Sequence, residues 1–160
     1  MTDLTSKNNP GKSVAFSTIA AAGLLSGTLD ICSAFLYSYI KKSTMPQTVL
    51  QNISKVAFGK ERFGEVWMQN ITGLLMHYVI AFGWTILFFL LYPRMKWMSR
   101  NRILTGIVYG LFVWTMMNVV LLPLWNYKPF VFNPEVSTIN AVILILAIGM
   151  PLSFIAGKKR

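Results

Sequence analysis

Residues 21–30 read AAGLLSGTLD and lie inside an apolar run that extends from Val14 to Ile40. At helical spacing Gly23, Gly27 and Asp30 fall on one face of this run, so small residues lead up to an acid. In a membrane, small residues let a second helix approach closely, and an ionisable residue faces a bundle interior or a water-filled cavity. The stretch therefore predicts a membrane-spanning helix whose glycine-lined face packs against protein, with Asp30 as the first candidate for function.

Three further apolar runs follow the first one. The four runs cover residues 14–40, 72–92, 103–125 and 138–156, and a hydrocarbon core takes roughly 20 helical residues to cross. With 54% hydrophobic and 12% charged residues, the 160-residue chain is poorly suited to a water-exposed surface. The sequence predicts an all-α, polytopic membrane protein. Its single four-helix transmembrane domain covers residues 14–157, between a polar N-terminal tail (1–13) and a basic C-terminal tail (158–160).

A shorter amphipathic segment separates the first two runs, at about residues 46–58. Val49, Ile53 and Val56 share one helical face, while Gln51 and Lys55 lie on the other. A proline at position 46 suits the first helical turn, and Thr44 is the expected N-cap. The segment is too short to span, so it predicts an interfacial helix that lies flat on the membrane or, as we favour, caps the bundle.

The net charge of +10 would indicate a nucleic-acid partner in a soluble protein. Here the basic residues lie in the connections between apolar runs, so we expect them to contact lipid headgroups and not nucleic acid. The N-terminal tail, the connection over residues 94–102 and the C-terminal tail together carry more Lys and Arg than the other two connections. This bias predicts that both termini are cytoplasmic, although the connection over residues 41–62, itself basic, argues against it.

Polar side chains occur at a similar depth in all four runs. They are Asp30, His77, Asn118 and Asn140, and all lie in the membrane half that faces the first and third connections. Tyr109 is a further candidate for this intramembrane polar site. The positions expected to allow close helix packing are Gly23, Gly27, Gly73, Gly106 and Gly110.

An aspartate beside a histidine can share a proton and titrate as a unit, which suits a proton relay or a small polar binding site. The alternative is that these side chains only form hydrogen bonds between helices, and we favour that reading for Asn118 and Asn140. No catalytic motif is present, and the single histidine excludes a histidine-rich metal site. The sequence thus predicts no catalytic residue, no metal and no cofactor.

The chain also resembles a family. The segments that carry the resemblance are AGLLSGTLD (22–30), VLQNI (49–53) after Pro46, GLLMHY (73–78) and MNVVLLPL (117–124). Together they resemble a group of small bacterial four-helix inner-membrane proteins of unknown function. The resemblance implies the bacterial inner membrane and draws attention to Asp30, His77, Asn118 and Pro123, and it implies no activity.

Two classes of function remain open. In the first, the protein is a small permease or a proton-linked transport component in which Asp30 and His77 exchange protons. In the second, it is an accessory or assembly protein whose amphipathic helix and small-residue faces bind other membrane proteins. An intramembrane enzyme is less favoured, because it would need more convergent groups. The expected partners are the lipid bilayer and a second copy of the chain or another membrane protein.

Overall fold

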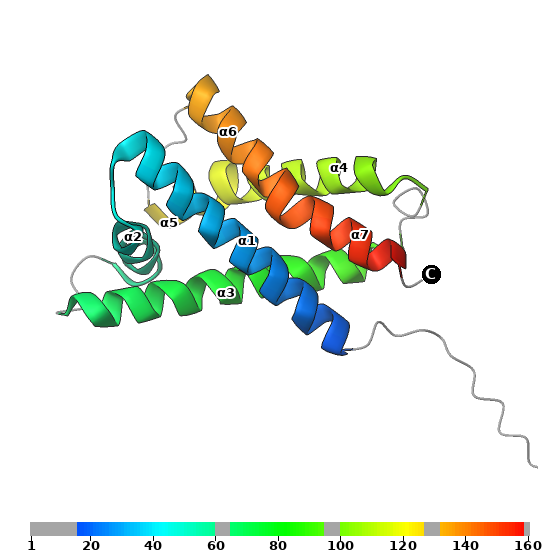
Figure 1. Ribbon diagram of the computed structural model, residues 1–160, viewed down its shortest axis with the longest axis horizontal. Helices are drawn as coiled ribbons and strands as arrows, with labels where there is room; N and C mark the ends of the chain where they lie inside the picture. The colour runs from blue at the N-terminus through cyan, green and yellow to red at the C-terminus, as the bar shows by residue number, and fades with distance from the viewer. Residues whose placement is uncertain (1–15, 60–64, 95–99, 127–131, 159–160) are drawn as a thin grey trace, which may run out of the picture.

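The computed structural model describes residues 16–59, 65–94, 100–126 and 132–158, and these residues form helices and short connections (Figure 1). The predicted all-helical fold is confirmed, with no strand among the residues described. The N-terminal tail expected over residues 1–13 lies outside them. The elements are α1 (Phe16–Lys42), α2 (Pro46–Phe58), α3 (Val66–Leu91), α4 (Arg102–Thr115), η2 (Met116–Leu121), α5 (Leu122–Asn126), α6 (Pro134–Leu144), η3 (Ile145–Gly149) and α7 (Met150–Lys158).

Four of the helices are long and apolar enough to cross a membrane. They are α1, α3, the continuous α4–η2–α5 helix and the continuous α6–η3–α7 helix, whose apolar stretches have 23 to 26 residues each. Figure 1 shows the start of α1 and the end of α7 at the same end of the bundle, where α3 also connects to α4. We call this the termini end. The opposite end carries α2 and the start of α6.

Two helices begin earlier than the apolar runs predict. The third helix, α3, starts at Val66 instead of Thr72, and so includes the polar residues Gln69 and Asn70. Helix α6 starts at Pro134, and Asn133 is its N-cap, where the side-chain oxygen accepts a hydrogen bond from the amide of Val136. Backbone hydrogen bonds, and not hydropathy, set helix ends, so a helix can continue beyond its apolar stretch.

The two π-helical segments each lie just before a proline. Segment η2 ends two residues before Pro123, and η3 ends two residues before Pro151. A proline inside a helix has no amide hydrogen, and its ring clashes with the carbonyl four residues earlier. A wider turn, with bonds such as Leu122 N–H to the Met117 carbonyl, relieves that clash. The prolines therefore explain why these two long helices are widened at these points.

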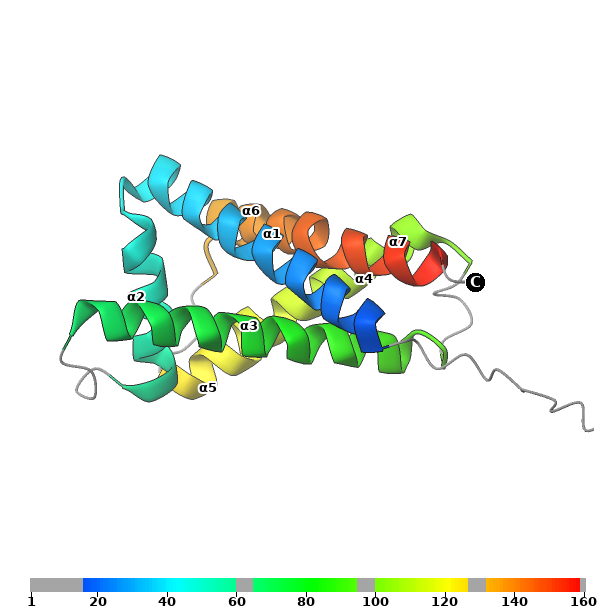
Figure 2. The same ribbon diagram turned by 60° about the horizontal axis from the view of Figure 1, so that its bottom comes forward.

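Helix α2 lies across the end of the bundle opposite the termini end (Figure 2). It packs against α3 so closely that a Cβ atom on Gly73 would overlap the backbone carbonyl of Leu50. The expected N-cap is wrong in detail, because Met45 occupies the N-cap position and provides no side-chain hydrogen bond. The Thr44 hydroxyl instead bonds the hydroxyl of Ser38 at 2.5 Å, and so ties the start of α2 to the end of α1.

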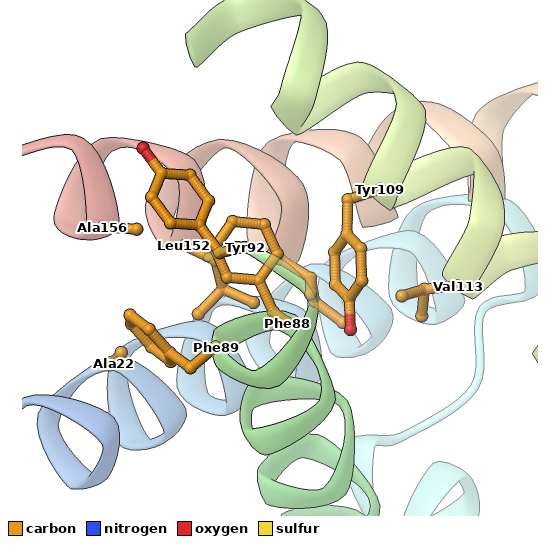
Figure 3. Close-up of a cluster of buried hydrophobic side chains, with 9 residues drawn as sticks. Ala22, Phe88, Phe89, Tyr92, Tyr109, Val113, Leu152 and Ala156 are labelled. Carbon is orange, nitrogen blue, oxygen red and sulfur yellow. The ribbon is translucent and has the colours of Figure 1, made fainter. Parts of the chain in front are cut away.

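The hydrophobic core lies toward the termini end. It combines Phe88 and Phe89 of α3, and Tyr92 directly after α3, with residues of α1, α4, η3 and α7 (Figure 3). In Figure 3 the ring of Phe88 stands beside that of Tyr109, and the two ring centroids are 4.8 Å apart. This aromatic cluster fills the bundle interior between α3, α4 and α7.

Candidate functional site

Asp30 lies on the face of α1 that is directed into the bundle, and its side chain is half-buried. The same face carries Gly23 and Gly27, which lie against α3. A Cβ atom on Gly23 would lie 2.5 Å from the ring of Phe82, and one on Gly27 would lie 3.1 Å from Tyr78 and from Ala81. The absence of side chains at these two glycines therefore lets α1 approach α3 closely, one helical turn from Asp30.

His77 is the residue of α3 that reaches the backbone of α1. Its side chain is 8% exposed, and its Nε2 atom lies 2.9 Å from the carbonyl oxygen of Gly27. A carbonyl oxygen only accepts hydrogen bonds, so Nε2 carries the proton of this bond. The nitrogen that can gain or lose a proton without breaking the contact is then Nδ1.

Asp30 and His77 thus lie at the same level of the α1–α3 interface, because Gly27 precedes Asp30 by three residues. An electrostatic interaction links the imidazole to the carboxylate. The two side chains do not form a direct ion pair. Within the described ranges, the side-chain ion pair is that of Lys41 with Glu135, whose nitrogen and oxygen atoms are 2.6 Å apart. It joins the last turn of α1 to the first turn of α6. His77 is therefore anchored to the backbone beside Asp30 and leaves the carboxylate without an ion-pair partner.

Three hydroxyl groups complete the surroundings of this pair. The Tyr78 hydroxyl bonds the Thr28 hydroxyl at 2.9 Å and forms a second polar link between α3 and α1. Ser26, one helical turn before Asp30 on the inward face, is 1% exposed, and its Oγ has no hydrogen-bond partner within the described part of the chain. An unsatisfied buried hydroxyl costs about 1–3 kcal/mol, so Ser26 adds a costly polar group to the surroundings of Asp30.

The other three predicted polar residues form no hydrogen bond to Asp30 or His77 in the described part of the chain. The Asn118 amide donates to the Trp114 carbonyl of its own helix at 3.0 Å, inside the π-helical segment η2. Asn140 is half-buried on α6, one turn after the buried Ser137. The Tyr109 hydroxyl donates to the carbonyl of Trp84 at 2.5 Å, within the aromatic cluster.

The predicted packing glycines of the third run lie at a second close interface. Gly106 and Gly110 of α4 face η3 and α7, where a Cβ atom on Gly110 would lie 2.5 Å from the Cα atom of Ile145. The opposing residue is Gly149, on which a Cβ atom would overlap the carbonyl of Gly106. Glycines on both sides thus bring the two backbones together at this interface.

Sequence reasoning missed several residues of the site. Gly149 could have been recognised, because it stands two residues before Pro151 on a run that is otherwise apolar. The Gly27 carbonyl, by contrast, leaves no signal in the sequence, since every residue has one. The described residues contain no group of three or more His, Cys, Asp or Glu side chains that could hold a metal ion.

Comparison of this chain with protein-family models, with curated proteins and with solved structures finds no match. The interpretation of the site therefore depends on its geometry.

Proposed function

We propose that this chain is a multi-pass protein of the bacterial inner membrane, with both termini cytoplasmic, and that Asp30 and His77 move protons as part of a small transport system. The observation that carries the proposal is the position of Asp30. It is a half-buried acid on an inward helix face, it interacts electrostatically with His77, and no residue of the described ranges forms an ion pair with it.

The cost of such a carboxylate supports a functional role. An ionised aspartate at the centre of a membrane helix costs roughly 2.5–3.5 kcal/mol on insertion scales. A purely structural role could be filled by a neutral amide that makes the same hydrogen bonds at lower cost. An acid at this place therefore supports a role in which a proton or a positively charged solute is taken up and released.

The surrounding groups support the exchange of a proton in particular. The Nε2 atom of His77 is committed to the Gly27 carbonyl, so the imidazole can exchange a proton at Nδ1 without leaving its place. A water molecule bound to the Ser26 hydroxyl would lie one helical turn from Asp30. Water of this kind would connect the carboxylate to a proton pathway.

The aromatic cluster gives the pathway a direction. On α3, Phe88 follows His77 by three turns, which corresponds to about 16 Å at a rise of 1.5 Å per residue. The cluster therefore lies between the Asp30–His77 pair and the termini end. We propose that protons reach the pair from the α2 end, and that passage past the cluster requires a second conformation of the bundle.

The alternative function, an assembly protein that binds partners through its amphipathic helix, has weaker support. Helix α2 packs its backbone at Leu50 against Gly73 of α3, and its Ser54 is buried. Its contact face is therefore occupied within the chain, and a partner would have to bind elsewhere.

The test is proton movement in liposomes that contain the purified protein and an internal pH-sensitive dye. We expect an imposed pH gradient to dissipate faster with the wild-type protein than in empty liposomes, and Asp30→Asn to remove this difference. Glu135→Gln is the matched control, because it neutralises an exposed carboxylate at the end of the bundle. Equal rates for wild-type protein and Asp30→Asn would refute the role of Asp30.

A further inference from the structure

The termini end of the bundle carries a cluster of exposed basic residues, Arg94, Arg100, Arg102 and Lys158, which we call the basic end. Figure 1 shows that the end of α3, the start of α4 and the end of α7 meet there. The acidic residues of the described ranges are elsewhere. Glu65 directly precedes α3 and Glu135 lies in the first turn of α6, both at the opposite end, while Asp30 lies within α1. The described part of the basic end therefore has four positive charges and no acid to neutralise them.

Arg102 fixes the geometry of this cluster. Its Nη2 atom donates a 2.7 Å hydrogen bond to the carbonyl of Gly157, so the guanidinium joins the first turn of α4 to the last turn of α7. A Cβ atom on Gly157 would overlap the Arg102 side chain, so the guanidinium packs directly against the glycine backbone. The contact holds the start of α4 next to Lys158, and a guanidinium has further N–H donors for an anion.

The helix that begins here adds to the attraction for anions. Helix α4 starts at Arg102, and the N-terminus of a helix carries a partial positive charge. The Asn101 side chain accepts hydrogen bonds from the amides of Ile103 and Leu104, which orders this turn. Ordered cations beside a helix N-terminus match the charge and the hydrogen-bonding capacity of a phosphate group.

Apolar side chains next to the cations distinguish a lipid from a free anion. Ile103 and Leu104 follow Arg102 directly and are 54% and 47% exposed. Phe154, one turn before Lys158 on α7, is 48% exposed. A ligand that covers both the cations and these apolar side chains needs a phosphate group with hydrocarbon next to it.

We propose that the basic end binds the phosphate of an anionic glycerophospholipid, whose acyl chains lie along Ile103, Leu104 and Phe154. In the described part of the opposite end, the exposed Lys41 is paired with Glu135. The inference rests on the proposed membrane insertion but not on proton movement.

The test is native mass spectrometry of the full-length protein in neutral detergent, titrated with phosphatidylglycerol or phosphatidylcholine. The test variant is Arg100→Gln with Lys158→Gln, which leaves the Arg102–Gly157 contact in place. The matched control, Lys41→Gln with Lys55→Gln, removes the same charge from the opposite end. Each cation near an anionic headgroup contributes about a five-fold change in affinity, so the test variant should bind phosphatidylglycerol about 25-fold more weakly.

We expect the control variant and Asp30→Asn to bind phosphatidylglycerol as the wild-type protein does. Equal binding of the two lipids, or equal loss in the test and control variants, would overturn the lipid site. Displacement of the lipid by millimolar inorganic phosphate would show a general anion site and would also overturn it. Failure of the protein to enter liposomes would overturn membrane insertion, whereas a lack of proton movement with normal insertion would leave the lipid site intact.

Discussion

Replacing Gly110 with alanine tests the close packing of α4 on the last long helix. The added Cβ atom would lie 2.5 Å from the Cα atom of Ile145 and 2.9 Å from its amide nitrogen, whereas ordinary contacts begin at 3.4 Å. Because backbone atoms cannot rotate away, the helix that contains η3 must withdraw by about 1 Å. Overpacking of this kind costs about 3 kcal/mol, and the higher helix propensity of alanine returns about 1 kcal/mol. We expect Gly110→Ala to lower the free energy of unfolding by about 2 kcal/mol.

The assay is reversible unfolding in mixed micelles, followed by circular dichroism as the fraction of denaturing detergent increases. The matched control is Gly83→Ala, because Gly83 lies exposed on α3, and a Cβ atom there would have no atom within 4 Å. This control should leave stability unchanged or raise it by up to about 1 kcal/mol. Equal stability of Gly110→Ala and the wild-type protein would refute the close approach, as would an equal loss in the control.

Two further predictions concern contacts that tie α3 to its neighbours. Gly73→Ala should push α2 away from α3, because the added Cβ atom would overlap the Leu50 carbonyl. Spin labels at Asn52 and Ile71 should then report a longer or broader distribution of the distance between the two labels. An unchanged distance distribution would contradict the packing of α2. Tyr109→Phe should destabilise the fold by about 0.5–1.5 kcal/mol, since it removes the hydrogen bond to the Trp84 carbonyl and keeps the ring in the aromatic cluster. A loss above about 3 kcal/mol in the same unfolding assay would show that the hydroxyl does more than form this one hydrogen bond.

The fold class could be predicted because apolar runs of sufficient length have few alternatives to a helix. Helix ends were less predictable, since hydropathy marks where a chain suits hydrocarbon, while caps such as Asn133 decide where the helix begins. The widened turns of η2 and η3 also escaped prediction. The prolines that follow them were visible, but a proline can end, kink or widen a helix, and the tertiary contacts decide among these outcomes.

The candidate site could be predicted only in part, for a physical reason. Periodicity places a residue on a helix face and at a depth, and so it nominated Asp30 and His77. It does not show how two helices are rotated about their axes, so it could not show that His77 bonds the Gly27 carbonyl instead of the Asp30 carboxylate. For the same reason Tyr109 could not be separated in advance from the polar residues, although its hydroxyl bonds the backbone of α3 in the core.

The most direct test of the central claim is a double-mutant cycle between Asp30 and His77. The variants are Asp30→Asn, His77→Gln and the double variant, each unfolded reversibly in mixed micelles at one pH. If the two side chains act as one site, the loss caused by His77→Gln should be smaller when Asp30 is already neutral, with a coupling free energy of about 1 kcal/mol or more. Losses that add to within about 0.3–0.5 kcal/mol would show that the two residues act independently and would contradict the proposed site.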